Sequence, residues 1–513
     1  MNAHDSNTQF FWLLLIAFVV ALAARRFRVP YALALVLTGL VLGAARLFPG
    51  VHLEPQLLFT VFLPPLLFEA ALHLRLDALR RNWAPIAIYT LAGTILSTLI
   101  VGVAASWLLG LPLLTALLFG ALISATDPIS VLAIFKRLGA GRRLTLIMEA
   151  ESLFNDGVAA VLFAVLSSAA LGGTLSASGA GGQFLQLIVG GTLLGALIGA
   201  AASRMHQDLD DHLVEITLTT LAAFGSYGAA ESLHVSGVMA VVAAGLVIGN
   251  FGQGAMTPGT RLAVAAFWEY AGFVVNSLIF LLIGLEVVGF DWSHKIALAL
   301  GAAFVVLLGR SVIYPLSWVV NRLGGQVPLA WQHVLVWGGL RGALSMALVL
   351  GLPVHFAGRE TLVAATFGVV MFSLLVQGFS VGPLLQRLNL SGQSARGPQD
   401  EGRLQSELRA TKAALSYLDE LRLSEAYPRW IIETLAHDYG RRLALLETDA
   451  GSSPRDGLRE EKQSAQVRTL VLSHEKKSYQ DAERHGLLDE EEWRRIAARI
   501  DAELFALKVK QGE

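Results

Sequence analysis

The chain has 513 residues, of which 54% are apolar and only 15% are charged, and its mean hydropathy is +0.57. In soluble globular proteins about a quarter of all residues are charged, so this composition excludes a protein built only of soluble domains. The net charge of −1 gives no electrostatic argument for nucleic-acid binding. The lack of cysteine excludes disulfides, thiolate metal sites and a cysteine nucleophile.

Charged residues are distributed unevenly along the chain. Residues 1–386 contain 18 basic and 17 acidic residues, whereas the much shorter stretch 387–513 contains 21 and 23. Because membrane-embedded segments are poor in charge, this contrast predicts a transmembrane domain over residues 1–388 and a cytosolic tail over residues 389–513.

Apolar runs long enough to cross a bilayer, about 20 residues as a helix, recur through the first domain. They predict an all-α polytopic membrane fold of about 13 transmembrane helices. The runs lie near residues 9–24, 30–45, 55–74, 83–109, 112–135, 144–171, 184–203, 213–231, 235–250, 267–288, 296–320, 330–353 and 361–386. The first run is not expected to be a cleaved signal peptide, because no lysine or arginine precedes it.

The loops between these runs predict the orientation. With the amino terminus outside, the inner loops carry thirteen lysines and arginines and the outer loops carry three. Because cytoplasmic loops are enriched in these residues, the amino terminus is predicted to lie outside the cell membrane. An odd number of spans then places the tail in the cytoplasm.

Glycine and proline concentrate in three runs, LPPLLFEAAL (63–72), SATDPISVL (124–132) and WGGLRGALSM (337–346). Non-helical backbone at membrane depth is tolerated where it is buried in protein or lines an aqueous cavity. Two breaks, one in each half of the chain, are typical of the inverted repeats of secondary transporters. No residue-level repeat is recognisable, so the indication is topological.

Ionisable side chains inside the predicted spans are the most informative residues, because each costs roughly 2.5–3.5 kcal/mol at the bilayer centre. They comprise four carboxylates and two arginines: Glu69, Asp127, Glu151, Asp156, Arg310 and Arg341. Left ionised and unpaired, the carboxylates alone would cost on the order of 10 kcal/mol. We therefore expect them to pair, to be protonated or to bind a cation.

Spacing on the sixth run places these residues on two strips of one helix. Ser152 and Asp156 are four residues apart, as are Glu151 and Asn155, and the two strips lie about 100° apart. One strip can present a hydroxyl and a carboxylate to a cation, while the other can hold a carboxylate toward an arginine.

The fifth run supplies further oxygen atoms. Pro128 lacks an amide donor and disfavours helical geometry at Asp127, which frees carbonyl groups near Thr126. Carboxylate, hydroxyl and carbonyl oxygens suit a hard cation such as Na⁺, Li⁺ or K⁺. A pocket that must hold either a proton or such a cation is the minimal device for cation/proton exchange.

Five segments together resemble one known family. LPPLLFEA (63–70), SATDPISVL (124–132), ESLFNDG (151–157), GRSVIYPLS (309–317) and GGLRGALS (338–345) are similar to the motifs of the monovalent cation:proton antiporters of the NhaP-type sodium/proton exchangers. The resemblance covers roughly the first 390 residues, and its most specific part is ESLFND preceded by TDP.

The resemblance implies thirteen spans, with six-helix inverted repeats that form a core and a dimerisation domain in a homodimer working by alternating access. It implies that Asp127 and Asp156 bind the ion, and that Ser152, the Thr126 carbonyl and Glu69 are ligands or near neighbours.

The resemblance also assigns structural roles. Glu151 would pair with Arg310, and Arg341 would orient the broken twelfth helix. Asn155 stands where the family's electroneutral members have asparagine, which implies one cation exchanged for one proton.

Several assignments retain alternatives. The Ser152 hydroxyl can bond back to its own helix, Glu69 can reach the inner interface, and the Glu151 ion pair can be purely structural. Asn250 and Asn276 are expected to bond across helices. Carboxylates nearer the run ends, and one histidine, are expected to be solvated or interfacial: Glu149, Glu215, Glu231, Glu269, Glu286 and His333.

The tail predicts a small helical domain, from a breaker-rich linker at 391–400, a helix at 408–423 and a second interruption at 448–459. We expect no cofactor, no nucleic-acid partner and no enzymatic activity. Two other function classes remain, a channel or proton-independent transporter and an intramembrane hydrolase. The hydrolase is disfavoured because HExxH and GxSxG motifs are lacking.

Overall fold

The computed structural model describes residues 3–27, 31–48, 55–171, 177–206, 211–254, 256–288, 295–353, 355–391, 398–423, 429–451, 472–473, 475–477, 479 and 490–511. All regular structure in these ranges is helical. The chain divides into two compact units, Met1–Ser394 and Ala395–Glu513.

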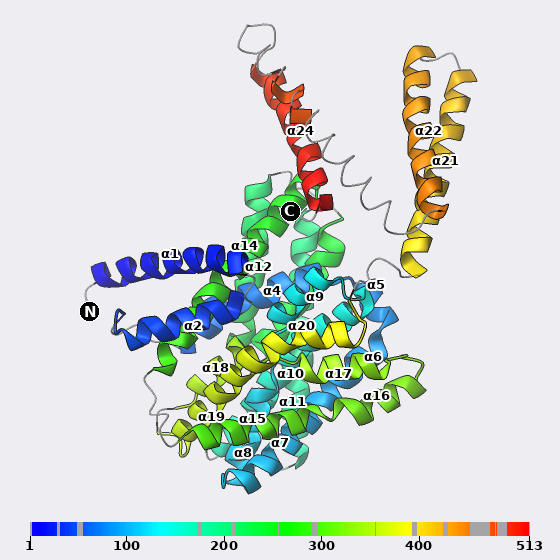
Figure 1. Cartoon of the computed structure of the whole chain (residues 1–513). Coiled ribbons are helices and arrows are strands. Elements are labelled where there is room, and N and C mark those ends of the chain that lie inside the picture. The colour runs from blue at the N-terminus through cyan, green and yellow to red at the C-terminus, as the bar shows by residue number, and fades with distance from the viewer. Residues whose placement is uncertain are drawn as a thin grey trace. The chain divides into compact units, whose positions relative to one another are not determined.

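The first unit consists of helices joined by short connections (Figure 1). In chain order they are α1 (Ala3–Phe27), α2 (Tyr31–Ala44), α3 (Pro55–Leu57), η1 (Leu58–Phe62), α4 (Leu63–His73), α5 (Leu76–Arg81), α6 (Trp83–Ala87), η2 (Ile88–Gly93), α7 (Thr94–Leu108), α8 (Leu113–Ser124), α9 (Ile129–Leu138), α10 (Arg142–Ala170), α11 (Ala177–Met205), α12 (His212–Ser232), α13 (Gly237–Val247), η4 (Ile248–Gly252), α14 (Pro258–Val287), α15 (Ile296–Arg310), α16 (Ile313–Arg322), α17 (Leu329–Trp337), α18 (Ala343–Leu350), α19 (Arg359–Phe372), η5 (Ser373–Gln377) and α20 (Gly378–Arg387).

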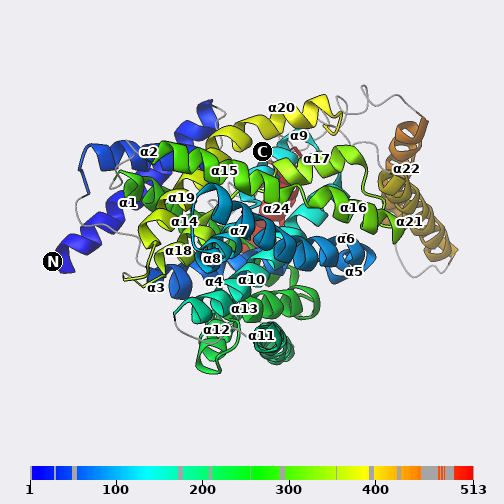
Figure 2. The same cartoon turned by 90° about the horizontal axis from the view of Figure 1, so that it is seen from below.

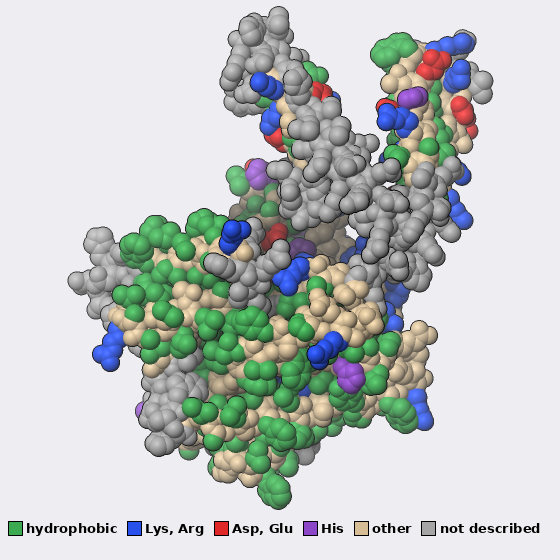
Figure 3. Space-filling model, viewed as in Figure 1, with side chains coloured by type: hydrophobic (Ala, Val, Ile, Leu, Met, Phe, Trp, Pro, Cys, Tyr) green, Lys and Arg blue, Asp and Glu red, His purple; other side chains and the backbone are tan. Residues whose placement is uncertain are grey.

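Length and hydropathy identify this unit as membrane-embedded. Among the described residues, seven helices are long and apolar enough to cross a membrane, and five shorter apolar helices accompany them. Large apolar side chains also cover its outer surface, as Figure 3 shows, with Trp107 93% exposed and Leu197 69% exposed. Such a surface is stable in lipid and unfavourable in water.

The helices of this unit pack as two groups. The first helix group contains α1, α2, α4 and α11 to α14, and the second contains α7 to α10 and α15 to α20. Figure 2 shows α7, α8 and α15 side by side in the second group. In the first group α2 and α14 touch through their backbones: a Cβ atom on Gly39 would lie 2.2 Å from the Leu281 carbonyl oxygen. The groups meet along α10, α13, α14 and α18.

Two transmembrane helices are interrupted, which confirms the two breaks predicted from glycine and proline. α8 ends at Ser124 and α9 begins at Ile129, while α17 ends at Trp337 and α18 begins at Ala343. The two interruptions lie next to each other, because the Asp127 amide donates to the Leu340 carbonyl oxygen over 2.8 Å. Backbone groups freed by one break are thus satisfied by the other.

The third proline-rich segment, at 63–72, stays helical. Its two prolines, Pro64 and Pro65, occupy the first turn of α4, directly after the π-helical turn η1. The helix therefore continues through both prolines, next to a π-helical turn, a local change of hydrogen bonding that accompanies interruptions of the regular helical pattern.

The regular structure in the described part of the second unit is helical. It contains α21 (Pro398–Leu423), α22 (Arg429–Gly451), which packs against α21, and α24 (Glu490–Gln511). The helix expected at 408–423 lies inside α21, and α22 extends into the predicted interruption at 448–459, of which residues 452–459 lie outside the described ranges. Residues 392–397 of the predicted linker at 391–400 also lie outside them, and its last three residues begin α21.

Candidate functional site

Asp127 lies in the first helix break, where the chain is extended between α8 and α9. Its carboxylate oxygen Oδ1 accepts a hydrogen bond from the Ile129 amide over 3.0 Å, at the start of α9. The amino-terminal end of a helix carries a partial positive charge and stabilises an adjacent carboxylate. The break therefore holds one carboxylate at a fixed place inside the membrane unit.

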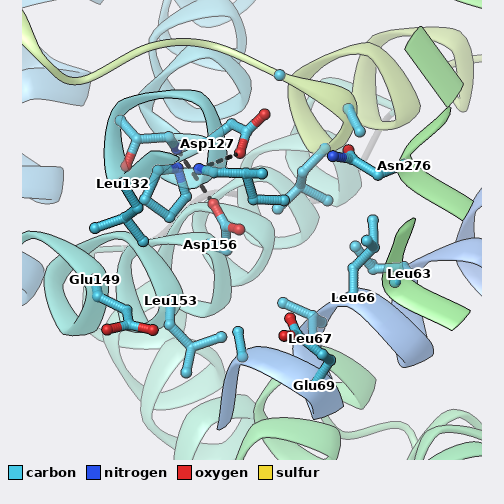
Figure 4. A pocket seen from close by; sticks show the side chains of 18 of the residues that line it. Leu63, Leu66, Leu67, Glu69, Asp127, Leu132, Glu149, Leu153, Asp156 and Asn276 are labelled. Carbon is cyan, nitrogen blue, oxygen red and sulfur yellow. Dashed lines mark hydrogen bonds between the residues drawn. The ribbon is translucent and has the colours of Figure 1, made fainter. Parts of the chain in front are cut away.

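Asp156 reaches the same place from α10. Its Oδ1 accepts from the Thr126 amide over 3.2 Å, so α10 is joined to the break at the residue before Asp127. Both aspartates line one cavity of about 360 Å³, and Figure 4 shows them close to each other on one side of it.

The cavity lies between the two helix groups. The second group contributes the first break, α10 and the start of α18, while the first group contributes α2, α4 and α14. Most lining side chains are apolar. Its polar and charged lining residues are Tyr31, Glu69, Thr126, Asp127, Lys136, Glu149, Asp156, Glu269, Asn276 and Ser345. Few polar groups in apolar surroundings strengthen every electrostatic interaction with a bound ion.

Asn155, on α10, holds the first break through hydrogen bonds and does not line the cavity. Its amide nitrogen donates to the Ser124 carbonyl over 2.8 Å and to the Thr126 hydroxyl over 3.2 Å, and its amide oxygen accepts from the Thr94 hydroxyl over 2.8 Å. The Thr126 hydroxyl in turn donates to Ser152 over 3.0 Å. These bonds fix the position of Thr126, whose amide holds Asp156.

Arg341 lies in the second break and is 2% exposed. Its guanidinium donates to the carbonyl oxygens of Ser124 and Ala125 over 3.0 and 3.2 Å. These carbonyls end α8, where the helix carries a partial negative charge. A buried positive charge at this point neutralises the helix end and gives its carbonyl groups a donor.

A second buried arginine forms an ion pair. Arg310, at the end of α15, donates to both carboxylate oxygens of Glu151 over 2.8 and 3.0 Å, and the two side chains are 9% and 1% exposed. Its Nε also donates to the Leu335 carbonyl over 3.3 Å. Bidentate geometry satisfies both charges and links α10 to α15 and α17.

The sequence from residue 13 to residue 387 matches the family model described as sodium/hydrogen exchanger, transmembrane. The chain belongs to this exchanger family. It is 41% identical over 394 residues to the Na(+)/H(+) antiporter ApNhaP of Aphanothece halophytica, a match that spans 76% of this chain and 74% of the relative. It is also 41% identical to the Na(+)/H(+) antiporter NhaP of Pseudomonas aeruginosa, over 70% of this chain and 89% of that one.

The fold agrees with that of a solved exchanger. The sodium proton antiporter MjNhaP1 of Methanocaldococcus jannaschii superposes with a TM-score of 0.63 over 76% of this chain and 99% of its own, at 21% identity. At this identity the similarity shows the fold alone.

The residues expected to bind the cation fall into two sets in this exchanger. Asp127, Asp156, Thr126 and Glu69 line the cavity. Ser152 is 1% exposed and lies behind Thr126, outside the cavity lining. Glu69 is 30% exposed at its side chain, and its Oε1 lies 3.6 Å from His73 Nδ1.

The carboxylates expected to be solvated or interfacial lie in different surroundings. Glu149 and Glu269 line the cavity, where Glu149 is half-buried and Glu269 is exposed. The solvated role expected of Glu215 is wrong: its side chain is fully buried, with one carboxylate oxygen 3.3 Å from His206 Nδ1. These differences arise because helix packing, which the sequence does not display, decides what covers a helix end.

The two asparagines expected to bond across helices also behave differently. Asn250 confirms the prediction, since its amide donates to the Leu74 carbonyl and accepts from the Leu76 amide, both over 2.8 Å. For Asn276 the prediction is wrong, because its side chain lines the cavity and bonds to none of the described residues.

Sequence reasoning missed one further residue. A Cβ atom on Gly342 would lie 2.6 Å from the Cβ of Asp127, so only glycine allows the second break to approach this aspartate. The glycine-rich motif around it was the available signal.

Proposed function

We propose that this protein exchanges Na⁺ for H⁺ across a cell membrane, with Li⁺ and K⁺ as alternative cations. The observation that carries the proposal is the meeting of two carboxylates, Asp127 and Asp156, in one cavity between two helix groups. A channel would not need a site that must always be occupied. The names of the similar antiporters agree with this cargo.

The mechanism follows from the cost of charge in an apolar site. An empty, doubly charged pocket is strongly disfavoured inside the membrane, so it takes up either a cation or a proton. Movement of one helix group against the other then exposes the occupied pocket on the opposite side of the membrane. Because only an occupied pocket can move, a pocket that carries the cation in one direction must return with a proton. The Na⁺ and H⁺ gradients set the direction of net exchange.

The cation would be bound by Asp127, Asp156, the Thr126 carbonyl and Glu69, with Ser152 close behind Thr126. These are hard oxygen ligands of the kind that alkali cations prefer.

Four other polar residues hold this arrangement without binding the cargo. The Glu151–Arg310 pair positions α10, and Arg341 positions the two breaks against each other. Asn155 braces Thr126. Because Asn155 is neutral, one charge fewer has to be compensated on each passage, and we propose electroneutral exchange of one cation for one proton.

We further propose thirteen spans over residues 1–388, arranged as inverted repeats, and a cytosolic helical domain over residues 389–513. The seven long apolar helices, the five shorter ones and the helix broken at 338–342 supply thirteen crossings. The amino terminus would lie outside and the tail in the cytoplasm, in keeping with the basic inner loops. A homodimer would hold the first helix group still while the second moves.

Proteoliposomes with an internal pH dye test the activity. An imposed pH gradient should collapse on addition of Na⁺, and valinomycin with K⁺ on both sides should leave the rate unchanged. Asp156→Asn should lower the rate by on the order of 100-fold, because the asparagine can neither carry a proton nor offset a cation. Asp77→Asn, at an exposed position on α5, is the control and should keep the native rate.

Cation flux without proton counter-flow would contradict exchange. A clear response of the rate to the membrane potential would contradict the electroneutral stoichiometry but not exchange itself.

A further inference from the structure

Asn276 occupies an unusual place for a neutral polar residue. It lies on α14, is only 7% exposed and lines the cavity that contains both aspartates. In Figure 4 its amide group is directed into the cavity from the side opposite Asp127 and Asp156.

The amide of Asn276 forms no hydrogen bond with any residue in the described part of the chain. Two other asparagines at helix contacts, Asn155 and Asn250, are different. Asn155 uses its amide oxygen once and its nitrogen twice, and so does Asn250, which bonds to Leu74, Leu76 and Leu246. Buried amides are nearly always satisfied, since an unbonded one loses its hydration without compensation. The amide of Asn276 is therefore available to something that enters the cavity.

The surroundings of Asn276 select the kind of ligand. One turn earlier on α14, a Cβ atom on Gly272 would lie 3.6 Å from the Cγ of Glu69, so the face of α14 that meets the cavity also packs against this carboxylate. The remaining polar lining is dominated by carboxylates. A neutral amide oxygen beside several carboxylates is a ligand suited to a hard cation.

We propose that Asn276 is a further ligand of the transported cation, contributed by the first helix group and responsible for part of the affinity and selectivity for Na⁺. The inference rests on the proposed function. It adds a ligand from α14 to a site otherwise built from the first break, α10 and α4.

Its position in the first helix group has a consequence. Asp127 and Asp156 belong to the second group and move with the cation, whereas Asn276 stays with α14. The amide can therefore bind the cation only while the cavity is in the arrangement of this structure. Asn276 strengthens cation binding from one side of the membrane and is left behind when the site moves.

The test compares two substitutions that a structural role would treat alike. Asn276→Ala removes the amide oxygen and should raise the apparent KM for Na⁺ by roughly 3- to 10-fold, the effect of one ligand or hydrogen bond. Asn276→Asp keeps the shape and adds a charge, and should lower KM for Na⁺ several-fold at alkaline pH. Both changes should appear on one side of oriented vesicles. Ser226→Ala is the matched control and should keep the native KM, because this buried hydroxyl on α12 bonds to the Ala223 carbonyl outside the cavity.

A second measurement needs no transport. Because the chain has no cysteine, Asn276→Cys carries a single thiol. A small methanethiosulfonate reagent should label it, and Na⁺ should slow the labelling several-fold while choline at equal ionic strength should not.

The proposal is overturned if alanine and aspartate both raise KM, if both leave it within about twofold of the native value, or if Na⁺ does not protect the thiol. Failure of the native protein to exchange cations for protons would instead reject the proposed function, and protection of the thiol by Na⁺ would still show cation binding at Asn276.

Discussion

The two helix breaks use the same backbone device with opposite charges. The first break presents Asp127 to the cavity, with its carboxylate held by the Ile129 amide at the start of α9. The second break contains Arg341, whose guanidinium turns away from solvent and bonds to the Ser124 and Ala125 carbonyls. The charge of the first break faces the cavity, whereas the charge of the second break bonds to the protein's own backbone.

This difference shows how a membrane protein can stabilise non-helical backbone inside the bilayer. Each break leaves helix ends with unsatisfied groups and a partial charge. The basic residue of the second break neutralises the carboxyl end of α8, and a peptide hydrogen bond between Asp127 and Leu340 joins the breaks. With the second break satisfying the backbone amide of Asp127, its carboxylate faces the cavity, where we propose that the cargo binds.

The largest effect is expected when the carboxylate of the first break is neutralised. Asp127→Asn should lower Na⁺-driven proton movement by on the order of 100-fold, because the pocket loses the charge that binds the cation. The rate of pH-gradient collapse in proteoliposomes measures this.

Asp211→Asn is the matched control for this change. Asp211 accepts a hydrogen bond from the Leu213 amide over 2.8 Å at the start of α12, as Asp127 does from Ile129, but lies outside the cavity. An equal loss in both variants would mean that helix capping, rather than the cavity charge, explains the result.

An intermediate effect is expected at the arginine of the second break. Arg341→Met should lower the exchange rate about 10-fold and reduce the thermal unfolding midpoint, because the Ala125 carbonyl loses the guanidinium donor and the Ser124 carbonyl keeps only that of Asn155. Arg341→Lys keeps the charge and should recover part of both quantities. Thermal unfolding in detergent and transport in proteoliposomes give the two readouts.

Arg359→Met provides the comparison, since Arg359 also donates to two carbonyls, those of Leu350 and Leu352, outside the cavity. It should affect stability far more than exchange. If Arg341→Met kept full exchange, exchange would not depend on Arg341 neutralising the carboxyl end of α8.

The smallest effect is expected where the second break touches the first. Gly342→Ala would place a Cβ atom 2.6 Å from the Cβ and 2.9 Å from the Oδ2 of Asp127. Asp127 and the second break must move apart to restore an ordinary contact of 3.4–4 Å, so we expect KM for Na⁺ to rise roughly threefold with little loss of maximal rate.

Gly225→Ala is the control for this substitution. Gly225 lies on α12, and a Cβ atom added to it would meet no other atom within 4 Å, so neither KM nor rate should change. A native KM for Gly342→Ala would show that the two breaks do not need this close approach.

Much of the site follows from the sequence because charge inside a membrane is costly and therefore conspicuous. Asp127 and Asp156 stand out among apolar neighbours, and the glycine and proline motifs mark both breaks. The contrary cases are neutral or peripheral residues. Asn276 looks like any polar residue of a helical bundle, and Glu215 looks like a helix-end carboxylate although it is fully buried against His206.

The sequence by itself determined the membrane location, the helical class, the two breaks and the set of costly charges, because hydropathy and the conformational limits of proline and glycine are local properties. Only the tertiary structure decided which charges meet. It placed Arg310 on Glu151, turned Arg341 toward the end of α8, and left the amide of Asn276 facing two aspartates from another helix group. Those pairings depend on how helices distant along the chain pack together, and a pattern within one helix carries no record of its neighbours.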